Sequence, residues 1–169
     1  AIANDTDRRK VARDMANQGD YAGALEVIKQ GHSASNGRKP SAEDLYTEAD
    51  IQIKFGFNSR AAEAWKQIVE THPRDNRSWR AYHELSKHYL YIENDPAMAR
   101  KLLGELLVRA EGAKVEASVL FDIGISYKIE KRWEEATTMF ERAMAVAPEP
   151  SDDDFEWSHL WTEMLTAAG

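Results

Sequence analysis

The sequence predicts an all-α protein built from repeated, antiparallel helix pairs. Four alanines recur 37, 38 and 37 residues apart, and each begins an apolar helical stripe just after a turn: Ala24, Ala61, Ala99 and Ala136. Self-similarity at a period of roughly 20 to 50 residues indicates stacked repeats, because one such unit cannot bury its apolar face alone. The chain holds only 5 prolines and 9 glycines, which is few for a fold made of many tight β-turns.

The composition allows a folded core and excludes several classes of function. Of the 169 residues, 43% are hydrophobic and 30% are charged. The net charge of −7 argues against nucleic-acid binding, which needs clustered lysines and arginines. Because the chain has no cysteine, disulfides, thiolate metal sites and cysteine nucleophiles are excluded. No apolar run approaches the roughly 18 residues of a membrane span, so no membrane insertion is expected.

The sequence leaves the cellular compartment open. No signal-peptide core is visible, and the chain begins at Ala1 rather than at a methionine. We therefore expect either a processed form or a fragment of a longer protein. A soluble chain of the cytoplasm fits, and so does a periplasmic or secreted chain if Ala1 follows a removed signal peptide.

The fourth repeat shows the helix pair most clearly. Its first helix places four residues on one face at i, i+3, i+4 and i+7 spacing: Leu120, Ile123, Gly124 and Tyr127. Residues 131–133 interrupt this stripe, and a second helix follows with one face formed by Ala136, Phe140, Ala143 and Met144. Pro148 ends the second helix because proline cannot continue a helix. The short turn makes the two helices antiparallel.

This pattern resembles the tetratricopeptide repeat (TPR). The family's spacing of bulky, small and aromatic residues is matched by Leu120, Gly124, Tyr127, Ala136, Phe140, Ala143 and Pro148. The small residues Gly124 and Ala136 are expected where the two helix backbones approach most closely. The other repeats depart in places. Glu48 stands where the family has an apolar residue, no proline closes the first repeat on time, and one residue is inserted around 93–96.

The resemblance implies a right-handed α-solenoid, which is a superhelix of antiparallel helix pairs. Four repeats are expected within residues 1–150, at about 5–40, 41–76, 77–112 and 113–150. Residues 151–169 are expected to form a C-terminal capping helix. The polar segment 32–40 is interpreted as a connector between the first two repeats, with a partner-contacting loop as the alternative.

The C-terminal segment carries a strong helix pattern. Its run of acids at 152–154 supplies a capping residue and suits the positive end of a helix dipole. One interpretation of the following apolar stripe is a cap over the open face of repeat four. The other is a docking helix for another subunit or for the rest of a longer chain, through Trp157, Leu160, Trp161 and Met164.

No motif predicts catalysis, a cofactor or a metal site. His83 and His88 nearly imitate the H-E-x-x-H zinc motif, but their five-residue spacing places them about 140° apart around a helix. No glycine-rich phosphate loop, nucleophile elbow or calcium loop is present. No set of nucleophile, base and orienting residue can be assembled from the motifs, so we expect a protein that is not an enzyme.

The resemblance also implies a concave groove lined by the first helix of each repeat. The family's inward-facing positions correspond here to Arg9, Arg13, Tyr46, Asp50, Lys54, Arg80, His83, Lys87, Tyr91, Phe121, Ile125 and Lys128. This set is basic and aromatic, with Asp50 as its only acid, in a chain of net charge −7. Such a groove suits an extended or helical peptide with acidic and apolar side chains.

The predicted function is therefore a protein–protein interaction scaffold or adaptor that binds a peptide or partner protein in this groove. The alternative is self-assembly into a dimer or filament through the C-terminal helix or the repeat ends, because exposed apolar ends of a repeat array need capping or pairing. The subset of the family that binds chaperone tails is disfavoured. Its two asparagines and final arginine are replaced here by Arg13, Thr47 and Glu84.

Overall fold

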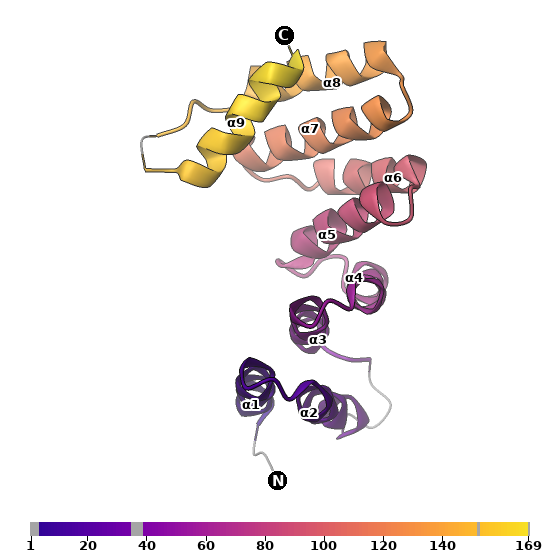
Figure 1. Cartoon of the computed structure of the whole chain (residues 1–169), viewed down its shortest axis with the longest axis vertical. Coiled ribbons are helices and arrows are strands. Elements are labelled where there is room, and N and C mark those ends of the chain that lie inside the picture. The colour runs from indigo at the N-terminus through magenta and orange to yellow at the C-terminus, as the bar shows by residue number, and fades with distance from the viewer. Residues whose placement is uncertain (1–3, 35–38, 152, 169) are drawn as a thin grey trace. The chain divides into compact units, whose positions relative to one another are not determined.

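The fold is entirely helical in the part of the chain that the structure describes. The computed structural model describes residues 4–34, 39–151 and 153–168. The regular elements in these ranges are α1 (Asp5–Asn17), α2 (Tyr21–Ala34), α3 (Ala42–Lys54), α4 (Asn58–Thr71), α5 (Ser78–Tyr91), α6 (Pro96–Leu107), α7 (Ala113–Ile129), α8 (Trp133–Val146) and α9 (Phe155–Ala168) (Figure 1). The prediction of an all-α helical repeat fold is confirmed. Residues 35–38 of the expected connector and Asp152 of the acidic run lie outside the described residues.

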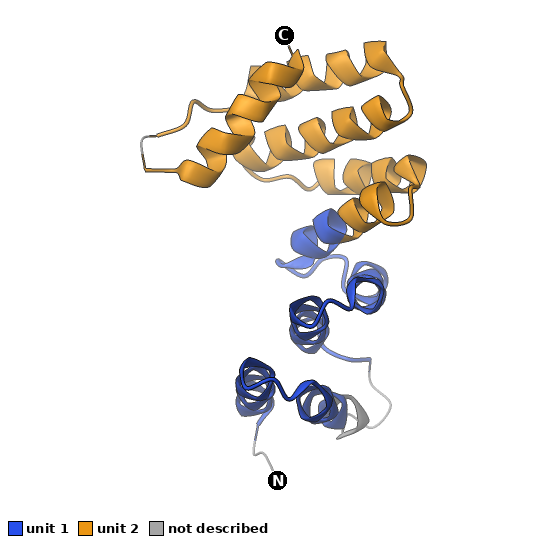
Figure 2. Ribbon diagram, in the orientation of Figure 1, with its two compact units in different colours: residues 1–84 blue, residues 85–169 orange. Residues whose placement is uncertain are grey.

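The chain divides into two compact units, residues 1–84 (unit 1) and 85–169 (unit 2), which Figure 2 colours separately. The boundary falls inside α5. In unit 1, α1 packs against α2 and α3, and α3 packs against α4. In unit 2, α7 packs against α6, α8 and α9. Each unit therefore has its own helix-to-helix core.

The turn between the two helices of each pair contains one residue with a left-handed backbone conformation. This residue lies two positions before the second helix begins. The φ angles are 89° at Gly19, 77° at Gly56, 53° at Asn94 and 60° at Lys131. Glycine adopts this conformation freely and asparagine tolerates it, whereas the Cβ of a lysine is strained there. The turn between α5 and α6 is one residue longer than the other three, which explains the single 38-residue spacing.

The four periodic alanines hold equivalent places, each as the fourth residue of the second helix of a pair. The exposed fraction is 0% for Ala24, Ala61 and Ala99 and 2% for Ala136. The amide N–H of each donates to the carbonyl of the residue just before its helix, at 3.0 to 3.1 Å. Each alanine thus closes the first helical turn, while its small side chain lets the partner helix lie close.

Gly124 lies where α7 and α8 approach each other. A Cβ placed on Gly124 would overlap the ring of Phe140, which is buried. The Phe140 ring also packs against Phe121, with 5.4 Å between the ring centroids. The close approach expected at Gly124 from the sequence is confirmed, and the neighbouring side chain that requires it is Phe140.

The C-terminal helix α9 completes the core of unit 2. Trp157 and Met164 are buried among side chains of α7 and α8. The indole N–H of Trp157 donates to the carbonyl of Pro148 at 2.8 Å. The Asp154 carboxylate accepts the N–H of Trp157 at 3.1 Å and also pairs with Lys114. Asp154 is therefore the acid that caps this helix.

We predict that Gly124→Ala lowers the free energy of unfolding by about 1–3 kcal/mol, because the added methyl group overpacks the α7–α8 interface. Gly104→Ala is the matched control, since a Cβ on Gly104 meets no atom within 4 Å. In α6 that change should stabilise the protein by about 0.5–1 kcal/mol. Urea unfolding followed by circular dichroism measures both, and equal effects of the two variants would contradict the packing argument.

We predict that Lys131→Gly stabilises the protein by about 0.5–1 kcal/mol, because glycine relieves the strain of the left-handed turn residue. Gly56→Ala introduces the same strain at the equivalent turn, so it should cost about 1 kcal/mol or more. The two melting temperatures should move in opposite directions. A lower melting temperature for Lys131→Gly would show that the lysine side chain makes a compensating contact.

Candidate functional site

The structure distributes the predicted groove residues over both units. Unit 1 holds Arg9, Arg13, Tyr46, Asp50, Lys54, Arg80 and His83. Unit 2 holds Lys87, Tyr91, Phe121, Ile125 and Lys128. The two sets have different surroundings, because most of those in unit 1 bind neighbouring helices while four of those in unit 2 line a cavity.

In unit 1, two predicted groove cations bridge α1 and α3. The guanidinium of Arg13 donates to the hydroxyl of Thr47 at 3.1 Å. The ammonium of Lys54 donates to the amide oxygen of Asn17 at 2.6 Å. Both contacts join the first helix of one repeat to the first helix of the next, so these side chains help to stack the repeats.

Two further residues of the predicted groove join α3 to the first half of α5. Arg80 and Asp50 form an ion pair with 2.8 Å between nitrogen and oxygen. The Arg80 guanidinium also lies over the ring of Trp65, 5.4 Å from its centroid. His83 is partly buried on the same helix and has an interaction partner of its own. The only acid of the predicted set is therefore already neutralised by another member of that set.

Arg9 belongs to a buried network of charges that the sequence did not predict. Its guanidinium contacts Asp44 at 3.1 Å and Glu43 at 2.9 Å, and Arg8 contacts the other oxygen of Asp44 at 2.9 Å. Arg77 continues the network to Glu43 at 2.8 Å. Asp44 is only 4% exposed, and both α1 arginines are buried with it. Buried guanidiniums are stable only when paired, so Asp44 holds α1 against α3.

Two sequence signals could have located this network. Ser41 and Asp44 form a helix-start pattern, and the Ser41 hydroxyl accepts the amide N–H of Asp44 at 3.1 Å. Gly31 stands inside α2, where a Cβ would overlap the Arg8 guanidinium. A glycine within a helix indicates a close neighbour, although the sequence does not say which one.

Tyr46 is part of the core of unit 1 rather than of an open surface. Its side chain is 6% exposed and meets Trp65 edge to face, with 5.4 Å between the ring centroids. The Arg77 guanidinium lies 5.9 Å from the Tyr46 ring. Burial raises the pKa of the Tyr46 hydroxyl from 10.0 to about 12. The prediction that Tyr46 faces a ligand is therefore replaced by a packing role.

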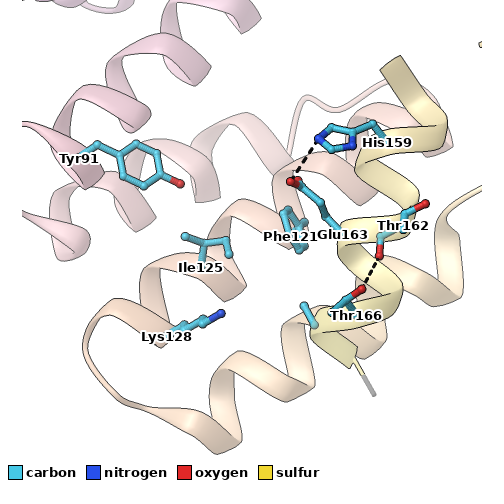
Figure 3. A pocket seen from close by; sticks show the side chains of 9 residues that line it. Tyr91, Phe121, Ile125, Lys128, His159, Thr162, Glu163 and Thr166 are labelled. Atoms are coloured by element: carbon cyan, nitrogen blue, oxygen red, sulfur yellow. Dashed lines mark hydrogen bonds and ion pairs between the residues drawn. The ribbon is translucent and has the colours of Figure 1, made fainter. Parts of the chain in front are cut away.

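Unit 2 brings four predicted residues together around one cavity of about 460 Å³. Tyr91 of α5 and three residues of α7 line one side, namely Phe121, Ile125 and Lys128 (Figure 3). Helix α9 forms the opposite wall with His159, Thr162, Glu163, Thr166 and Ala167. This α7–α9 cavity does not include Lys87, which is partly buried on α5.

The charged side chains of the α7–α9 cavity are incompletely paired. Lys128 is exposed and has no ion-pair partner among the described residues. Glu163 lies 3.5 Å from the ring of His159, on the opposite wall. Tyr91 is 61% exposed, and its partial burial, then the charges of Asp122 and Glu163, raise the pKa of its hydroxyl. The cavity thus has an unpaired ammonium, Lys128, on the α7 side and a carboxylate, Glu163, on the α9 side.

The α9 wall is the part of this site that sequence reasoning missed. Of the predicted docking stripe, Trp157 and Met164 are buried in unit 2, and Leu160 and Trp161 are partly buried against the same core. The apolar stripe therefore faces the chain itself. The polar face of α9, which carried no motif, is the face that borders the cavity.

The described residues contain no group of three or more histidines, cysteines, aspartates or glutamates placed to hold a metal ion. His88 instead lies 3.1 Å from Glu93 in the turn after α5. None of the helices in the described ranges is both long enough and apolar enough to cross a membrane.

We predict that Asp44→Asn lowers the free energy of unfolding by about 3 kcal/mol, because two buried guanidiniums lose their only buried counter-charge and keep only the more exposed carboxylates of Asp5 and Glu43. Glu43→Gln is the matched control. Its carboxylate also pairs with two arginines, but the Glu43 side chain is 44% exposed, so the loss should stay below about 1 kcal/mol. Urea unfolding at neutral pH measures both, and similar losses would contradict a buried role for Asp44.

The fold matches solved structures across nearly its whole length. MamA RS-1, as an ArsTM double mutant, has a TM-score of 0.64 at 18% sequence identity, over 99% of this chain and 94% of that one. A putative kinesin light chain from Podosopora anserina with nearly identical TPR-like repeats has a TM-score of 0.66 at 16% identity, over 95% and 84%. BtubC (BKLC) from P. vanneervenii has a TM-score of 0.68 at 17% identity, over 97% and 72%.

No family model and no curated protein matches the chain. The likeness to solved structures is therefore one of fold. It agrees with the helix pairs described above. The TPR-type architecture predicted from the sequence is confirmed, and this chain has the tetratricopeptide-repeat fold.

Proposed function

We propose that this chain is a protein-interaction scaffold without catalytic activity of its own, and that its α7–α9 cavity receives a short segment of a partner protein. The fold supports the general role, because stacked helical repeats present extended surfaces on which other proteins bind. The cavity supports the more specific role, since it is the place in unit 2 where predicted groove residues converge.

The observation that carries this proposal is an unpaired ammonium beside an apolar floor. Lys128 lies next to Ile125 and Phe121 on one face of α7, and all three line the cavity. Phe121 is only 7% exposed, so the accessible apolar contact comes mainly from partly buried Ile125 and from exposed Tyr91. An ammonium attracts a carboxylate, and the floor offers contact to an aliphatic or aromatic side chain. A peptide segment with acidic and apolar residues fits this combination.

Unit 1 supports the same assignment by contrast. Its predicted groove cations already have partners: Arg9 in the Asp44 network, Arg13 on Thr47 and Arg80 on Asp50. A ligand that used these cations would have to break contacts that join the repeats. We therefore place the binding site in unit 2.

The side chains of the cavity do not form a catalytic set, which supports a binding role. The hydroxyls of Thr162 and Thr166 donate to the main-chain carbonyls of Ser158 and Thr162, each at 2.9 Å. Neither hydroxyl donates to a base, and the nearest imidazole, His159, faces Glu163 instead. A nucleophile needs a base within hydrogen-bond reach to be activated.

Selection from a displayed random-peptide library, followed by calorimetric titration of the synthetic binder, tests this proposal. We predict that Tyr91→Ala with Lys128→Ala weakens the binder about tenfold or more, which is ~1.4 kcal/mol. Trp133→Ala with Lys131→Ala is the matched control. It also removes one exposed aromatic ring and one lysine from unit 2, but outside the cavity.

The control variant should bind within about twofold of the wild type. Unchanged helicity of both variants by circular dichroism excludes unfolding as the cause of a loss. Failure to select any peptide, or equal loss of binding in both double variants, would sink the assignment of the site to the α7–α9 cavity.

A further inference from the structure

The two ends of the α7–α9 cavity differ in charge. Lys128 stands at one end, near the C-terminus of α7, and Glu163 of α9 stands at the other end beside His159 (Figure 3). Partial burial, and then the charges of Asp122 and Glu163, raise the pKa of the Tyr91 hydroxyl. A ligand that carried only acidic groups would satisfy Lys128 but would be repelled at the Glu163 end.

The two walls also differ in hydrogen-bonding capacity. The hydroxyls of Thr162 and Thr166 give their protons to main-chain carbonyls of α9, so neither has a proton left to donate to a ligand. Glu163 adds a carboxylate to the same wall. On the facing wall, Lys128 and the Tyr91 hydroxyl are donors. The α9 wall therefore offers the Glu163 carboxylate as an acceptor, and the opposite wall offers the Lys128 ammonium as a donor.

The helix geometry sets the length of the α7 wall. Phe121 and Lys128 both line the cavity and lie two turns apart on one face of α7, while Glu163 lines it from α9 (Figure 3). Seven residues at about 1.5 Å each place Phe121 and Lys128 about 10 Å apart along the helix. An extended peptide advances about 3.3 Å per residue, so about three peptide residues span this distance.

We propose that the cavity selects a dipolar peptide segment, in which an acidic residue binds Lys128, a basic residue binds Glu163 and an apolar residue between them covers Ile125. The two charged residues lie about three positions apart in the segment. This inference rests on the proposed function, and it adds the charge pattern that the partner must carry.

A small set of synthetic peptides with blocked ends tests the pattern. In each peptide, two residues that include a leucine separate two charged residues. Two peptides carry Glu and Lys in opposite orders, a third carries two Glu and a fourth carries two Lys. We expect one of the two mixed peptides to bind about tenfold more tightly than the two-Glu or the two-Lys peptide. Each exposed ion pair raises the affinity a few-fold, and each like-charge contact lowers it. Similar affinity of the two-Glu peptide and the better mixed peptide would overturn the inference.

A charge-swap variant makes the test directional. Lys128→Glu with Glu163→Lys keeps the net charge of the chain and exchanges the two ends of the cavity. The preference between the two mixed peptides should invert in this variant, a result that a merely structural role of either residue does not produce. An unchanged order of preference would overturn the inference.

Single neutral variants keep the test informative if the double variant folds poorly. Lys128→Gln should remove the discrimination between mixed and two-Lys peptides, and Glu163→Gln should remove that between mixed and two-Glu peptides. If the proposed function itself is wrong, the experiment gives a different result from a failure of the charge pattern alone. In that case neither the four peptides nor any library-derived peptide binds the wild-type chain.

Discussion

The close approach of the two helices in each pair is the constraint on which the rest of the structure depends. A left-handed turn residue and a buried alanine five positions later recur in all four pairs. The turn fixes where the second helix starts, and the alanine fixes how near the two axes lie. Because both features concern only the backbone and the smallest side chains, the remaining positions of each first helix are free to differ in chemistry between repeats.

Unit 1 uses this freedom to join one repeat to the next by charge. Asp44 receives Arg8 and Arg9 from the neighbouring repeat, and Glu43 carries the network on to Arg77. Guanidiniums out of contact with water are costly unless they are paired. The arginines that resemble ligand contacts in the sequence therefore have a structural role here, and the acidic residues of the chain are part of that role.

Unit 2 leaves Tyr91 and Lys128 exposed beside the cavity, whereas Phe121 is buried in its core. Helix α9 serves two purposes with two faces. Trp157 and Met164 complete the core, while Thr162 and Glu163 border the cavity. An amphipathic helix that ends a repeat array is expected to shield the last apolar face. Here the same helix also supplies one wall of the cavity, and the terminal cap is thereby part of the candidate site.

By itself, the sequence determined the helical class, the repeat period and the anchoring alanines. It also determined the tight contact at Gly124 and the existence of α9. All of these follow from periodic or local patterns. It also predicted groove residues in both units. Only the tertiary structure decided which of them are free. Arg9 meets a carboxylate 35 residues away, and Tyr46 is covered by Trp65. Burial and pairing depend on neighbours brought together by packing, whereas a stripe in the sequence shows only which residues share a face.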